Sequence, residues 1–196
     1  MTSDFFRKLG CHQSDFCFND VNIEIFQTAL GSVQYARNVD IVHPNLIPVP
    51  IGTRDGYEFD ASNTVKTKLV LSCARTNSLD RVNLSKYINK SKWCTVLGET
   101  KFDEYIKQVE EHKFMFSPEG FGYDCFRTWE ALYCGTYPIV KRRVFTEEFA
   151  KHLPILVIDA WDEVTEDFLN AKYIEFQNKE WNWDLLTEEY WINILN

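Results

Sequence analysis

The residues of this chain that are best placed to do chemistry lie between Phe114 and Lys141, in the segment FMFSPEGFGYDCFRTWEALYCGTYPIVK. This segment predicts a strand, a loop that contains Gly120 and Gly122, a helix that begins near Asp124, and a second strand. In an open α/β sheet, ligands bind beyond the carboxyl ends of the strands, where a helix N-terminus presents unpaired N–H groups to an anion. The segment therefore favours a ligand that carries phosphate.

Arg127 and Glu130 are three residues apart in the predicted helix, so they share one of its faces. An arginine in the first turn of a helix is unfavourable for the helix dipole, and a bound diphosphate would reverse that penalty. Each charge-assisted hydrogen bond to phosphate contributes about 1.5 to 3 kcal/mol. Arg127 is therefore a candidate phosphate ligand, and the alternative is a surface ion pair between Arg127 and Glu130.

The elements that must position these residues follow from the pattern beyond residue 63. Short apolar runs alternate with longer amphipathic ones, as is typical of a parallel sheet that helices cover on both faces. The predicted strands are residues 68–72, 93–97, 114–117, 137–140 and 155–158, and a helix is expected over residues 101–112. We therefore predict an α/β fold with a doubly wound parallel sheet over residues 63–196.

The pattern before residue 63 is different. Val21, Ile23 and Ile25 alternate as in a strand, and residues 43–52, HPNLIPVPIG, hold three prolines. Such a run cannot form a helix or a central strand, and it fits an extended connector. Residues 1–62 are therefore expected to form a short N-terminal appendage and a linker.

The tail from Trp181 onward carries apolar residues at helical spacing. They are Trp181, Trp183, Leu185, Leu186, Tyr190, Trp191 and Ile194. We predict a Trp-rich amphipathic C-terminal helix that must cover an apolar surface, because soluble monomers rarely expose a patch of that size. The appendage, a second copy in a homodimer, or a partner subunit could supply that surface.

Composition narrows the classes of function. The 196 residues carry a net charge of −8 with a pI near 5.0, which argues against nucleic acid as a partner. No apolar run predicts a membrane span, and the first ten residues, MTSDFFRKLG, lack the order of a secretory signal. The six cysteines and four histidines show no metal-ligand spacing, so we expect no metal site. Because a secretory segment is lacking, we expect reduced thiols and a cytoplasmic protein.

The segment SPEGFGYDCFRTWEALYCGTYPIV resembles the donor-binding motif of exostosin-like glycosyltransferases, which runs roughly SPxGxGxDxxRxWEALxxGxxPIV. The earlier HPNLIPVPIG is similar to that family's linker into the donor-binding domain, and the later LPILVIDAWDEVTEDFL is similar to its next strand and helix. The resemblance spans about residues 39–168. It implies a GT-B architecture, in which a Rossmann-like carboxyl-terminal domain holds a nucleoside diphosphate sugar as donor substrate.

The resemblance also implies roles for particular residues. Arg127 would contact the diphosphate, Glu130 the ribose hydroxyls, and the backbone from Glu119 to Gly122 the phosphates or the sugar. Arg75, in LSCARTN, matches a second diphosphate ligand of related enzymes. The expected donor-binding residues are Arg75, Glu119, Gly120, Gly122, Asp124, Arg127 and Glu130. The family usually needs no bound metal, because arginine and the helix dipole stabilise the leaving group.

The chain departs from the family before its linker, where about 40 residues are too few for a complete acceptor domain. The usual source of the general base is therefore truncated or absent. The acid-base candidates of the appendage are Asp4, His12, Asp15 and Asp20, of which Asp15 and Asp20 are the weak candidates for the general base. A third reading, a doubly wound interaction domain that binds no ligand, is disfavoured by the family-like order of the motif residues, so two functions remain open. One is a metal-independent glycosyltransferase that moves a sugar to a hydroxyl of a glycan or protein acceptor, and the other is a noncatalytic nucleotide-sugar-binding module that needs a partner for activity.

Overall fold

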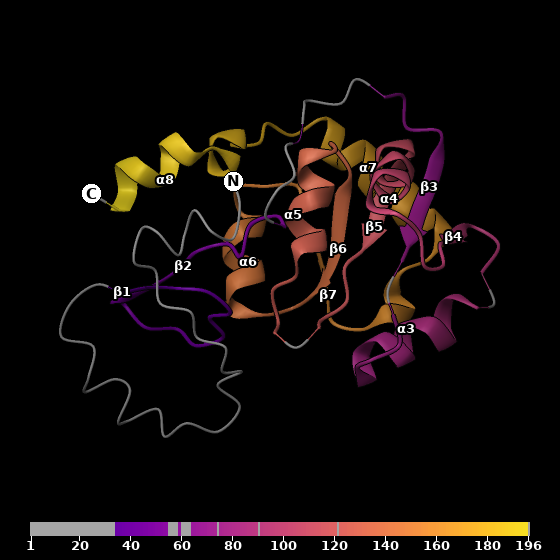
Figure 1. Cartoon of the computed structure of the whole chain (residues 1–196), viewed down its shortest axis with the longest axis horizontal. Helices are drawn as coiled ribbons and strands as arrows, with labels where there is room; N and C mark the ends of the chain where they lie inside the picture. The colour runs from indigo at the N-terminus through magenta and orange to yellow at the C-terminus, as the bar shows by residue number, and fades with distance from the viewer. Residues whose placement is uncertain are drawn as a thin grey trace.

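A five-stranded parallel sheet forms the centre of the computed structural model (Figure 1), which describes residues 34–54, 59, 64–73, 75–89, 91–120 and 122–195. Its strands are β3 (Lys68–Ser72), β4 (Cys94–Val96), β5 (His112–Phe116), β6 (Tyr137–Lys141) and β7 (Leu156–Ile158). They lie in the order β4-β3-β5-β6-β7, and every adjacent pair is parallel. The predicted α/β, Rossmann-like fold is confirmed.

Helices cover both faces of the sheet. Val70, Phe114 and Ile158 face one side, where α3 (Leu79–Ile88) and α7 (Glu166–Gln177) complete the core. Leu71 and Met115 face the other side, beneath α4 (Phe102–Glu111) and α5 (Phe126–Tyr133). Adjacent residues of one strand are thus buried on opposite faces, which explains why these strands are apolar throughout rather than alternating.

Most predicted boundaries lie within two residues of the observed ones. β3 has the predicted bounds, whereas β5 begins at His112 because this buried residue pairs with Lys68 in the neighbouring strand. The predicted helix before β5 is α4, and Tyr105 and Val109 are its buried residues. Asp15, Asp20 and the alternating residues Val21, Ile23 and Ile25 lie outside the described residues.

Residues 34–54 pack against the sheet domain. β1 (Gln34–Ala36) and β2 (Leu46–Pro48) form a separate two-stranded parallel ladder, and Val49 joins the core cluster around Trp129. Asp40 accepts a hydrogen bond from the backbone N–H of Val144, at the start of α6 (Val144–Ala150). The proline-rich run begins with a turn at Pro44 and Asn45 and is extended over β2, and the backbone N–H of Ile51 bonds it to the domain that follows.

The Trp-rich tail is helical over a shorter range than predicted. A 3₁₀ turn, η2 (Trp183–Leu186), precedes the helix α8 (Glu188–Leu195). Trp191 is buried against Phe149, and Trp181 packs on Phe176. Two of the three tail tryptophans therefore find their apolar surface within the chain, and Trp183 remains 42% exposed. In the described part of the chain, no helix is long and apolar enough to cross a membrane.

We expect the buried imidazole of His112 to make the fold sensitive to acid. Its Nδ1 contacts the carbonyl of Gln108, its Nε2 has no hydrogen-bond partner among the described residues, and burial lowers its pKa below the ordinary 6.5. The charges that act on it are Lys66, Lys68 and Glu111. Because the folded state disfavours the protonated imidazole, this contribution to stability is present above pH 6.5 and is lost as the pH falls below it.

Urea unfolding of the wild type and of His112→Gln at pH 7.5 and at pH 5.5 measures this effect. The free energy of unfolding should fall less on acidification in His112→Gln than in the wild type. His152→Gln, which changes an exposed histidine, is the matched control and should keep the wild-type decrease. An equal decrease in all three proteins would show that His112 does not cause it.

Candidate functional site

A cleft of about 870 Å³ opens at the carboxyl ends of β3, β4 and β5. β3 and β5 are neighbours in the sheet although β4 lies between them in the chain, so the connections after them run in opposite directions along the sheet. This divergence is the switch point at which doubly wound folds bind ligands. The edge of the sheet at which a ligand is predicted therefore carries a cleft within the size range of small-molecule binding sites.

Arginine is the dominant charged residue in the lining of this cleft. Arg54, Arg75, Arg81 and Arg127 all line it, whereas the lining carboxylates are those of Glu99 and Asp124. The chain as a whole has a net charge of −8, so this excess of arginine is local. Such a cleft attracts an anionic ligand even though the protein repels anions at long range.

Arg127 lies in the first turn of α5, as predicted. Its side chain lines the cleft beside the thiol of Cys73, whose pKa burial raises above its ordinary value. The N-cap of α5, Cys125, is extended and makes no side-chain capping bond. None of the ion pairs among the described residues involves Arg127. The alternative of a surface ion pair between Arg127 and Glu130 is therefore wrong.

Glu130 lies behind the wall of the cleft rather than on it. Its side chain is 0% exposed, and its Oε2 accepts a hydrogen bond of 2.8 Å from the Tyr105 hydroxyl. Its Oε1 is 3.2 Å from Nε of Arg54. Burial raises the pKa of Glu130, and Arg54, Tyr105 and Arg127 partly offset that rise. Both partners of this carboxylate, Arg54 and Tyr105, line the cleft and so lie between Glu130 and the open space.

Arg75 lines the cleft from the segment after β3, where the sequence places it. It forms an ion pair with Glu99, and both side chains are largely exposed, 72% and 76%. An ion pair between two solvated side chains contributes little stability. Arg75 can therefore leave Glu99 for a bound phosphate at small cost.

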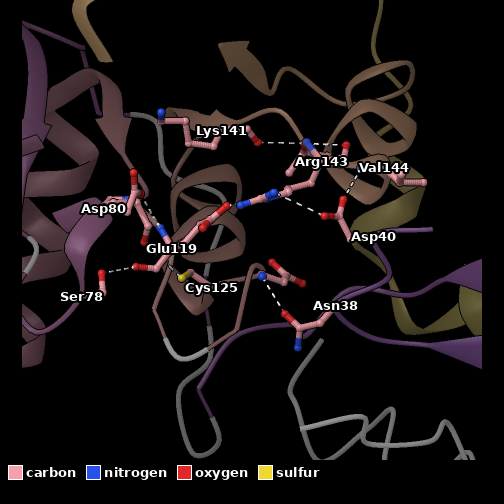
Figure 2. A network of polar contacts seen from close by, with 12 residues as sticks. Asn38, Asp40, Ser78, Asp80, Glu119, Cys125, Lys141, Arg143 and Val144 are labelled. Carbon is pink, nitrogen blue, oxygen red and sulfur yellow. Dashed lines mark hydrogen bonds and ion pairs between the residues drawn. The ribbon is translucent and has the colours of Figure 1, made fainter. Parts of the chain in front are cut away.

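Glu119 points away from the cleft. Its carboxylate accepts a hydrogen bond of 2.7 Å from Nε of Arg143, and its backbone N–H donates to Asp80 (Figure 2). Its carbonyl accepts hydrogen bonds from the hydroxyl of Ser78, the N-cap of α3, and from Nε of Arg81 within α3. The residue thus holds the loop before α5 between α3 and the start of α6, and it does not line the cleft.

Glu119 faces a smaller hollow of about 290 Å³ on the other side of the same loop. Its lining residues are Asp80, Glu119, Lys141, Arg142, Arg143 and Asp159. The three cations and three carboxylates cancel, and most of them are paired with one another. This hollow therefore favours no ion of either sign.

Gly120 and Gly122 line the cleft in a loop where the backbone N–H of Gly120 donates to the carbonyl of Gly122. A Cβ on Gly122 would lie 2.6 Å from Oδ1 of Asn38, and one on Gly120 would lie 2.8 Å from Nη2 of Arg81. A Cβ at either position would therefore force the Asn38 or the Arg81 side chain to shift. Packing thus favours glycine at both positions, independently of any ligand.

Asp124 is part of the cleft lining, but its carboxylate is buried and occupied. It accepts hydrogen bonds from the backbone N–H of Ile51 at 2.8 Å and from Nε1 of Trp129 at 2.9 Å. Burial raises the pKa of Asp124 from 3.8 to about 7, although these hydrogen bonds act to lower it. The backbone N–H of Asp124 donates to Asn38. In this structure Asp124 supports the wall of the cleft and presents no oxygen to a ligand.

Sequence reasoning missed several residues of this site. Arg54 and Ile51 belong to the linker, Arg81 to α3, and Phe102 and Tyr105 to α4, yet all of them line the cleft. Arg54 lies over the ring of Phe102, with its Cζ 5.1 Å from the ring centroid. Only the regular spacing of the α4 aromatic residues was a visible signal, and that spacing indicated a buried helix face.

Comparisons with known proteins leave the family open. No family model and no curated protein matches the chain. One similar solved structure is the crystal structure of the GtfA/B complex, at 12% sequence identity and a TM-score of 0.37. The match covers 79% of this chain and 40% of that chain, so this chain spans less than half of its length. The fold assignment rests on the strand order described above.

Replacing Gly122 should destabilise the protein more than replacing Gly98, which lies in the same cleft. In Gly122→Ala the Asn38 side chain must shift and loosen its 2.7 Å hydrogen bond to the Asp124 N–H, at a cost of about 1 to 3 kcal/mol. A Cβ on Gly98 meets nothing within 4 Å, so Gly98→Ala should change stability by less than about 0.5 kcal/mol. Urea unfolding compares the two variants, and equal effects would contradict the packing role of Gly122.

Proposed function

We propose that this chain binds a nucleoside diphosphate sugar in the cleft at the switch point and acts as the donor-binding part of a metal-independent, exostosin-like glycosyltransferase. The observation that carries the proposal is Arg127, an arginine at the uncapped N-terminus of α5 that lines the cleft and forms no ion pair with the described residues. A half-buried guanidinium of this kind is stabilised by a bound anion.

The geometry supports a definite orientation for the donor. Arg127 and the first turn of α5 would contact the diphosphate, and Arg75 would reach it after leaving Glu99. The same groups would then stabilise the negative charge that develops on the departing nucleoside diphosphate, which is the role that a metal ion has in other transferases. Glu130 would receive the ribose hydroxyls once Arg54 has moved.

One observation favours the noncatalytic alternative. The carboxylates that line the cleft, within the described residues, are those of Glu99 and Asp124, and both are occupied by other groups. The described lining contains no histidine. A general base would then come from outside this described lining, for example from Asp15 or Asp20, from a second copy of the chain or from a partner subunit.

Arg127→Ala should weaken the binding of a nucleoside diphosphate by about 10- to 150-fold and leave binding of the nucleoside nearly unchanged. The substitution removes a charge-assisted contact to phosphate of about 1.5 to 3 kcal/mol and touches neither base nor ribose. Calorimetric titration with uridine, guanosine and their diphosphates measures the difference. Arg142→Ala, which removes an exposed arginine outside the cleft, is the control and should bind both ligands as the wild type does. Equal weakening of nucleoside and diphosphate by Arg127→Ala would assign Arg127 a structural role.

Turnover separates the two functions. If the chain is a transferase, the nucleotide sugar that binds most tightly should release its nucleoside diphosphate slowly in water and faster with a hydroxyl acceptor. Asp15→Asn and Asp20→Asn should be assayed in parallel, because loss of turnover with unchanged donor affinity would identify the base. Tight binding without release of the nucleoside diphosphate under any of these conditions would support the noncatalytic module.

A further inference from the structure

Glu130 is a buried carboxylate with an incomplete set of partners inside the chain. Its side chain is 0% exposed, and the Tyr105 hydroxyl donates to Oε2. Oε1 accepts no hydrogen bond from the described residues, although Nε of Arg54 lies 3.2 Å away as an ion-pair partner. A buried carboxylate oxygen without a hydrogen-bond donor is costly, so this oxygen has an unused capacity to accept a bond.

Arg54 covers this oxygen from the side of the cleft. Its side chain is 45% exposed and lies over Phe102, and both residues line the cleft together with Tyr105. The two partners of the ion pair therefore differ in how easily their side chains can move. Arg54 can turn into the solvent-filled cleft and remain hydrated, whereas Glu130 is fixed in α5 beneath the wall.

Movement of Arg54 alone would leave a buried, uncompensated carboxylate, which is strongly unfavourable. The movement becomes favourable when two things arrive together, a hydrogen-bond donor for Oε1 and an anion for the released guanidinium. A ribose hydroxyl supplies the first and a phosphate supplies the second. A neutral nucleoside supplies only the first.

We infer that Arg54 is a specificity-determining residue. Without a ligand, it occupies the position beside Glu130 that a ligand hydroxyl would take. Only a ligand with both a hydroxyl donor for Glu130 and a phosphate for the displaced guanidinium can take that position. This inference rests on the proposed function of the cleft. It adds a residue from the linker to the site, and it makes recognition of ribose conditional on the diphosphate. Arg127 acts electrostatically on the same carboxylate, so the phosphate that it binds would lie near the displaced Arg54.

Arg54→Met tests the inference, since it removes the charge and keeps an apolar stem over Phe102. The probes are uridine, guanosine and their diphosphates, titrated into the full chain by calorimetry. The inference requires effects of opposite sign: the nucleoside should bind about threefold or more tighter because Glu130 is no longer occupied, and the diphosphate about tenfold weaker because a phosphate contact is lost. Thermal unfolding verifies that the variant is folded.

Arg75→Met is the matched control, because Arg75 is another exposed, ion-paired arginine of the same cleft but has no contact with Glu130. It should weaken the diphosphate and leave the nucleoside unchanged. In a Glu130→Gln background, Arg54→Met should no longer tighten the nucleoside, because the competition for Oε1 has been removed.

The outcomes separate this inference from the proposed function. If the wild type binds the diphosphate but Arg54→Met weakens nucleoside and diphosphate alike, Arg54 is an ordinary contact and the inference is wrong while the proposed function stands. If Arg54→Met leaves both affinities unchanged, Arg54 does not take part in binding. If the wild type binds none of the probes or their sugar conjugates, the proposed function is wrong and the inference with it.

Discussion

A buried aspartate joins the two parts of the chain that form the cleft. The carboxylate of Asp124 accepts hydrogen bonds from the backbone of Ile51 and from the indole of Trp129, so it links the linker to α5. The carboxylate is buried, so these hydrogen bonds are shielded from solvent. The position of Arg54 over Glu130 follows from this link, since Ile51 brings the linker to that wall of the cleft.

Local patterns in the sequence were sufficient to predict the sheet and the place of Arg127. A strand, a glycine-containing loop and a helix follow one another directly, so the first turn of α5 must lie at the carboxyl end of β5. The direction of the Glu119 side chain could not be predicted, because it depends on Arg143, the N-cap of α6, which is 24 residues away in the sequence. The contact between Arg54 and Glu130 was invisible for the same reason. Contacts between distant segments leave no periodic signal in one sequence.

The arginines of the cleft differ in how readily each could meet an anion. Arg75 is held by an exposed carboxylate, Arg54 by a buried one, and Arg127 by none among the described residues. Arg81 is largely occupied by the carbonyl of Glu119 and the side chain of Asn77. An acidic protein can thus keep a concentrated positive site, because neighbouring groups neutralise each arginine to a different degree until a ligand arrives.

The attachment of residues 34–54 also has a consequence for how the chain folds. Asn38 and Asp40 bond to residues that lie 86 and 104 positions later in the chain, in the loop before α5 and at the start of α6. Contacts between residues so far apart in sequence require closure of a long loop, and they form slowly. A nascent chain that emerges from its amino end holds this segment without those partners until most of the sheet has been synthesised. The wall of the cleft that contains Arg54 can therefore assemble only after α5, which carries Glu130, has been synthesised.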